Sequence, residues 1–206
     1  MELVSNSFAD GERADDRLVF AAPDPDERTH LSSNRNPHLS WSDVPEGTKS
    51  FVVTCIDPDC PSSGEDVNQE GREVSADLPR IDFVHWLLAD VPADITEIAE
   101  GSHSSQVTPR GKGPDAPVGI HGVNSYTDWT KGDPDLSGVW HGYDGPAPPW
   151  NDAIPHRYIF TVSALDIESL GLSPGFTRDE LLGVMDGHVL EEASLTTVYS
   201  TNPSAS

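Results

Sequence analysis

Lysine is the residue that this sequence most clearly lacks. The 206 residues contain 12 Lys and Arg against 35 Asp and Glu, a formal net charge of −23, and only three of the cations are lysines. Nucleic-acid binding needs a basic surface, and a charge this negative repels phosphate backbones and anionic membranes. We therefore expect no nucleic-acid partner.

Cysteine and long apolar runs are also scarce. The two cysteines, Cys55 and Cys60, are too few for a disulfide framework or a four-thiolate metal site. No window approaches the ~18 consecutive apolar residues of a membrane span. Residues 1–16 lack the basic and apolar blocks of a secretory signal. We expect a cytoplasmic protein with no membrane span.

The acidic residues are spread along the whole chain, from Asp10 to Glu192, instead of being gathered in one block. Scattered charge of this kind indicates a solvated acidic surface. High salt screens the self-repulsion of such a surface. The pattern therefore favours a halophilic protein, adapted to a salty cytoplasm, over an ordinary acidic one.

We expect molar KCl to raise the temperature at which the protein unfolds. The screening length falls from about 10 Å at 0.1 M salt to about 3 Å at 1 M, so repulsion among the dispersed carboxylates weakens. A thermal melt across a KCl series measures the effect. An equal or higher melting temperature in dilute buffer would contradict it.

Short runs rich in Val, Ile, Phe and Thr are the main secondary-structure signal, and they are typical of strands. The predicted strands are Leu18–Ala22, Ser50–Ile56, Phe83–Val91, Tyr158–Leu165 and Ser194–Ser200. The second and third are apolar on both faces, which predicts central strands.

One helix is clearly signalled near the end of the chain. Thr177 and Glu180 have the spacing of a capping box, and an apolar stripe at helical spacing follows. Because strands otherwise dominate, we predict a mainly β chain with one domain over residues 1–206. Its architecture is an antiparallel β-sandwich with peripheral helices, including a C-terminal helix.

Three segments carry polar side chains of chemical interest. Asp57–Pro61 directly follows a predicted strand that Pro58 should end, which indicates either a site with two carboxylates or an acidic turn. His85 lies in an apolar run. It is either a core histidine whose hydrogen bonds are made within the protein or a ligand-binding group. His156 and Tyr158 alternate onto one face of a strand, after a stiff segment rich in Gly and Pro.

Taken together and in this order, the segments resemble the phosphatidylethanolamine-binding proteins, most closely the prokaryotic branch called Raf kinase inhibitor-like. The resemblance runs from about Phe51 to Pro203. Its motifs are Asp57–Pro–Asp–Cys–Pro61, Phe83–Val–His85–Trp86, Gly145–Pro–Ala–Pro–Pro149 and His156–Arg–Tyr158. Cys60 stands where the family usually has Ala.

The resemblance implies a β-sandwich with a small anion pocket at one end, near the C-terminal helix. The pocket residues that it implies are Asp57, Asp59, His85, Gly145, His156 and Tyr158, with Pro61 and Pro148 shaping the walls. The implied ligands are phosphate, phosphorylated ligands or phospholipid head groups. We expect no catalytic residue, no metal and no cofactor, and we expect a protein partner and a homodimer.

Carboxylates beside an anion need a physical explanation. An aspartate that accepts a hydrogen bond from a histidine favours the imidazolium form. The outer edge of that histidine, the Tyr158 hydroxyl and backbone N–H groups near Gly145 would then face the anion.

Two other functions use the same residues or their neighbours. An enzyme could hold a metal with Asp57, Asp59, His85 and His156 or hydrolyse a substrate, although no H-E-x-x-H spacing and no G-x-S-x-G elbow is present. A partner-binding surface could instead use aromatic residues of the long loops. These are Tyr126, Trp129, Trp140, Tyr143 and Trp150.

Overall fold

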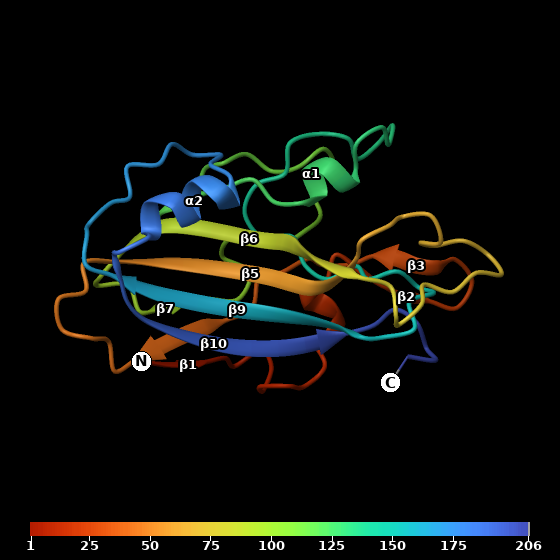
Figure 1. Cartoon of the computed structure of the whole chain (residues 1–206), viewed down its shortest axis with the longest axis horizontal. Helices are drawn as coiled ribbons and strands as arrows, with labels where there is room; N and C mark the ends of the chain where they lie inside the picture. Colours follow the sequence, from red (N-terminus) through yellow and green to blue (C-terminus); the bar gives the residue numbers. More distant parts are fainter. Residues whose placement is uncertain (206) are drawn as a thin grey trace.

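One antiparallel sheet of five strands dominates the computed structural model, which describes residues 1–205 (Figure 1). The strand order is β10-β9-β5-β6-β8, so β5 is the central strand. The strands are β5 (Ser50–Pro61), β6 (Arg80–Pro92), β8 (Ile120–His121), β9 (His156–Leu165) and β10 (Val189–Tyr199). Strands β5 and β6 both lie inside the sheet, with a strand on each side. Their apolar residues on both faces predicted this central position.

A smaller sheet packs on one face of the large one and makes a sandwich. Its order is β1-β4-β7, with β1 at Glu2–Val4, β4 at Leu39–Ser42 and β7 at Glu97–Ile98. The ring of Trp41 lies 5.3 Å from that of Phe51, between the two sheets. Both side chains belong to the main buried core, so the predicted antiparallel β-sandwich is confirmed.

Helix α2 (Arg178–Met185) covers the opposite face of the large sheet (Figure 1). Its capping box forms as predicted, with Thr177 at the N-cap. Leu181 and Met185 pack on buried residues of β5 and β6. The other helical segments are α1 (Tyr126–Trp129) and a 3-10 turn at Asp16–Leu18. Within residues 1–205, no helix is long and apolar enough to cross a membrane.

Several predicted strand boundaries are wrong. Strand β5 does not end at Pro58 but continues to Pro61. The pairing with β6 is irregular between Asp57 and Cys60, and pairing with β9 stops at Ile56, so Pro58 lies where no regular ladder bond is required.

The first predicted strand is also displaced. Residues 16–18 form the 3-10 turn, and the strand that follows is β2 (Ala21–Asp24). It pairs with β3 (Arg28–Leu31) in a two-stranded hairpin, at the far end of the molecule from α2 (Figure 1). Strand β10 likewise begins at Val189 instead of Ser194.

Candidate functional site

A cavity of about 420 Å³ opens beside the ends of β5, β6 and β9 and is covered on one side by α1. Six of the eight residues predicted for the pocket line it. They are Asp57, Pro61, His85, Pro148, His156 and Tyr158. We call Asp57, His85, His156 and Tyr158 the cavity floor, because each is at most 3% exposed.

The floor carries a buried chain of ionic hydrogen bonds. His156 Nδ1 lies 2.7 Å from Asp57 Oδ2, and its Nε2 lies 3.0 Å from Asp152 Oδ2. Asp152 in turn forms a two-pronged pair with Arg80, at 2.6 and 3.0 Å. Such bidentate pairs fix orientation as well as charge. The chain therefore holds His156 rigidly between two carboxylates.

His156 is an imidazolium across the neutral range. Burial lowers its pKa, but the hydrogen bonds to Asp152 and Asp57 and the charges of these carboxylates outweigh that effect and raise the pKa to about 9. Both N–H groups are donated to carboxylates. The expected imidazolium is present, but the expectation that its outer edge faces an anion is wrong, because Asp152 occupies that edge.

His85 has a fixed hydrogen position. Its Nδ1 lies 2.6 Å from the carbonyl oxygen of Asp144, an acceptor, so Nδ1 must carry the hydrogen. In the neutral ring Nε2 is then an acceptor. Burial, the largest influence, lowers the pKa of His85 from 6.5, against the raising effect of nearby Asp57. The neutral ring therefore predominates at neutral pH.

The Tyr158 hydroxyl has no hydrogen-bond partner among the described residues, although it is fully buried. Alternation along β9 places Tyr158 on the same side as His156, as predicted. Its ring meets that of His85 edge-on at 5.0 Å. A buried hydroxyl without a partner costs free energy, so a hydrogen bond from Tyr158 to a ligand in the cavity would be favourable.

Two of the predicted pocket residues are directed elsewhere. Asp59 accepts two hydrogen bonds of 2.8 Å from the guanidinium of Arg157. The N–H of Gly145 is donated to Asn34 Oδ1 at 2.7 Å. A Cβ at Gly145 would lie 2.2 Å from the backbone oxygen of Leu18, so glycine is needed there for close packing.

His85 is held in place by groups that the sequence motifs do not indicate. Asp144 is completely buried and accepts from Lys112 Nζ at 2.7 Å. Side-chain amides of Asn34 and Asn124 complete its hydrogen bonds, at 2.7 and 2.8 Å. The sequence offered one signal: Asp144 directly precedes Gly145, in the segment already singled out.

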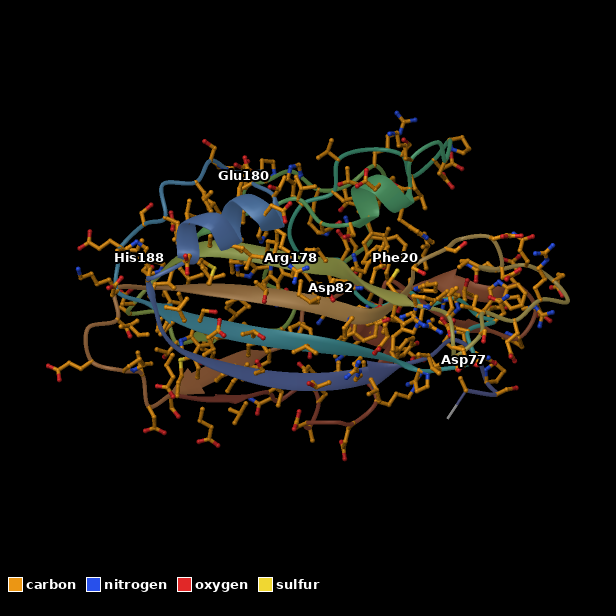
Figure 2. All side chains as sticks on the ribbon, viewed as in Figure 1. Phe20, Asp77, Asp82, Arg178, Glu180 and His188 are labelled. Carbon is orange, nitrogen blue, oxygen red and sulfur yellow. The ribbon has the colours of Figure 1, made fainter. Side chains whose placement is uncertain are left out.

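The mouth of the cavity is mixed in character. Ile81 and Trp129 line it and are about half exposed. Asp82, labelled in Figure 2, also lines it and forms a 2.8 Å ion pair with Arg178 at the start of α2. Asp128 is the other carboxylate at the mouth, and it is exposed.

Cys60 lines the same cavity but is not poised for reaction. Burial, followed by the charge of Asp57, raises the pKa of its thiol to about 12. The thiolate is the reactive form of cysteine, so this side chain acts as a wall. In the part of the chain that the structure describes, no group of three or more His, Cys, Asp or Glu is placed to hold a metal ion.

Most of the loop aromatics considered for partner binding pack inside the protein. Tyr126, Trp140 and Tyr143 are at most 2% exposed. The hydroxyl of Tyr126 is donated to the carbonyl oxygen of Gly145 at 2.6 Å. Only Trp129, half exposed at the cavity mouth, presents a large part of its ring to solvent.

Comparisons with known proteins agree with one another. The profile of a family described as phosphatidylethanolamine-binding protein matches residues 4–200. The UPF0098 protein YbhB of Escherichia coli is 36% identical, over 97% of this chain and 100% of that protein. A UPF0098 protein of Aquifex aeolicus is 33% identical, over 97% and 88%.

Solved structures give the same result for the fold. The crystal structure of Escherichia coli YbcL, described as a member of the mammalian PEBP family, superposes with a TM-score of 0.67 at 28% identity, over 97% of each chain. A putative phosphatidylethanolamine-binding protein homologue from Chlamydia trachomatis gives 0.64 at 26% identity, over 97% of this chain and 96% of that one.

Proposed function

Since this chain belongs to the phosphatidylethanolamine-binding protein family, we propose that it is a non-catalytic binding protein for a small oxyanion, free or as part of a phosphorylated molecule. The ligand occupies the cavity beside β5, β6 and β9. Phosphate, phosphorylated metabolites and phospholipid head groups share the oxyanion that this proposal requires.

The observation that carries the proposal is the hydroxyl of Tyr158, which has no hydrogen-bond partner within residues 1–205. It is a buried donor on the floor of a cavity whose volume, about 420 Å³, is in the range of small-molecule sites. His85 adds a second donor once its ring takes up a proton at Nε2. Anion affinity should therefore rise as the pH falls through the range in which His85 is protonated, below about 6.5.

Two further properties belong to this proposal. The scattered acidic charge supports a protein that works in a salty cytoplasm. The proposal also includes regulation through a protein partner and assembly as a homodimer, the two expectations that came from the resemblance to the family.

Replacing Tyr158 with Phe is expected to weaken binding of inorganic phosphate by about tenfold, because one hydrogen bond to a charged group is lost. The free energy of unfolding should stay equal or increase, since the hydroxyl has no partner in the described residues. Calorimetric titration with phosphate measures the affinity of both proteins, and binding should be tighter at about pH 6 than at about pH 8. Urea unfolding measures the change in stability.

Tyr199→Phe is the matched control for this experiment. Its hydroxyl donates a hydrogen bond to Asp16 at 2.8 Å, and its side chain does not line the cavity beside β5, β6 and β9. The control should lose stability and keep phosphate affinity. Unchanged affinity in Tyr158→Phe, or no phosphate binding by the unsubstituted protein at either pH, would show that the cavity is not an oxyanion site.

A further inference from the structure

We propose that the cavity selects oxyanions that still carry a proton, such as inorganic phosphate or a singly protonated phosphate ester, and rejects fully deprotonated ones such as sulfate. The inference rests on the proposed function and names its ligand class. It follows from the hydrogen-bonding character of the cavity floor, which is built mainly from acceptors.

No Lys or Arg is among the residues that line the cavity, within residues 1–205. Sites for anions with two full charges usually supply guanidinium or ammonium groups. Here the lining groups that can carry charge are Asp57, Cys60, Asp82, His85, Asp128 and His156. A doubly charged anion therefore meets three carboxylates and one imidazolium.

The charge of that imidazolium is already used. His156 donates one N–H to Asp57 and the other to Asp152, so it has no hydrogen left for a ligand. Arg80 does not line the cavity and is held by Asp152 behind the floor. Arg178 similarly pairs with Asp82 at the mouth. The positive charges near the cavity thus neutralise its carboxylates without contacting the ligand.

Asp57 is the main acceptor on the floor. One of its oxygens accepts from the backbone N–H of Asp59 at 2.7 Å, and the other accepts from His156. A carboxylate has about four acceptor positions, so two remain. His85 adds an acceptor at Nε2 while its ring is neutral. Tyr158 offers a single donor against these acceptors.

Whether a ligand binds therefore depends on whether its oxygens carry a proton. An unprotonated oxygen facing Asp57 meets another negative acceptor and is repelled. A P–OH group donates to Asp57 instead, while its unprotonated oxygens accept from Tyr158. Inorganic phosphate keeps one proton at about pH 8, whereas sulfate has none, so two anions of the same shape and charge are distinguished by one hydrogen bond.

Competing calorimetric titrations at about pH 8 and constant KCl test the inference, with inorganic phosphate and sulfate as probes. We expect phosphate to bind about 10- to 100-fold more tightly, the range for a hydrogen bond to a charged group. In Asp57→Asn the side-chain amide can donate, so the ratio should fall toward one. Asp128→Asn removes the same charge at the exposed mouth and should keep the ratio.

A second measurement does not depend on a variant that folds. Methyl phosphate is largely a dianion at about pH 8, because its second pKa is about 6. Its binding to the unsubstituted protein should take up about one proton, measured by calorimetry in buffers of different ionisation enthalpy. Binding without proton uptake would overturn the inference.

The outcomes separate the two proposals. Equal affinity for sulfate and phosphate, or an unchanged ratio in folded Asp57→Asn, overturns the proton-based selection alone. Failure of the unsubstituted protein to bind either anion at any pH overturns the proposed function, and this inference with it.

Discussion

Replacing Lys112 with Met is expected to lower the free energy of unfolding by about 3–5 kcal/mol, the usual cost of leaving one partner of a buried ion pair alone. Lys112 Nζ lies 2.7 Å from Asp144, whose side chain is completely buried. Burial raises the pKa of Asp144 in spite of the lysine charge. Without Lys112, no cation within residues 1–205 would offset the cost of burying the ionised carboxylate. Urea unfolding in high salt measures the change.

Lys49→Met is the matched control, because Lys49 is exposed and forms no ion pair in the described part of the chain. Exposed substitutions of this kind usually change stability by less than about 0.5 kcal/mol. Adding Asp144→Asn to Lys112→Met removes the stranded charge and should restore part of the loss. Equal stability of Lys112→Met and Lys49→Met would contradict the role assigned to the pair.

The same pair bears on ligand binding. The carbonyl oxygen of Asp144 holds Nδ1 of His85, and Lys112 also donates to the carbonyl oxygen of Tyr143 at 2.6 Å. Lys112 therefore fixes the backbone that sets the hydrogen position of His85. Phosphate affinity should decrease in Lys112→Met even under conditions where the variant remains folded.

Local patterns in the sequence were sufficient for the elements of the fold. The capping box at Thr177 formed because both of its hydrogen bonds join residues three positions apart. The apolar residues on both faces of Ser50–Ile56 placed this strand at the sheet centre. Such signals need no knowledge of distant residues.

The features that could not be predicted depend on contacts between residues far apart in the sequence. Asp57 and Asp59 look equivalent in their motif, yet only Asp57 faces the cavity, because Arg157 binds Asp59. Gly145 is a glycine because the backbone of Leu18 packs against it. Neither fact has any trace in local spacing, since each depends on a segment about a hundred residues away or more.

Of the two carboxylates that bind His156, only one could be predicted from the sequence. A histidine held protonated by an aspartate could be predicted from the residue types and the family motifs. The second carboxylate, Asp152, lies four residues before His156 in a loop, where no regular element fixes its direction. Its contact changes the role of His156 from a donor for the ligand to the support of Asp57.

Lowering the pH from about 7.5 to about 5 is expected to cost the protein about 4 kcal/mol of stability through two buried histidines. His103 and His121 are 7% and 1% exposed, and their rings lie 5.5 Å apart. Burial lowers their pKa values from 6.5 to about 4 and about 3, and for His121 the neighbouring His103, Lys112 and His141 add to the effect.

The sign follows from the direction of the shifts. The unfolded chain protonates both histidines as the pH falls below 6.5, while the folded protein does not until about 4 and 3, so protons favour unfolding in this window. Each histidine contributes about 2 kcal/mol at about pH 5. His156 does not add to this loss, because its pKa of about 9 makes its stabilisation complete below 6.5.

Urea unfolding at the two pH values, in constant high salt, measures the loss. The double variant His103→Leu with His121→Leu should lose much less stability between them. The replacement costs one hydrogen bond, between His103 Nδ1 and the Ser102 hydroxyl at 3.0 Å, because the other three ring nitrogens have no partner among residues 1–205. His30→Leu, at a half-exposed histidine, should behave like the unsubstituted protein. If the double variant does not fold, NMR titration of the unsubstituted protein decides: histidine resonances from His103 and His121 that titrate near pH 6.5 would show that burial does not keep these rings neutral.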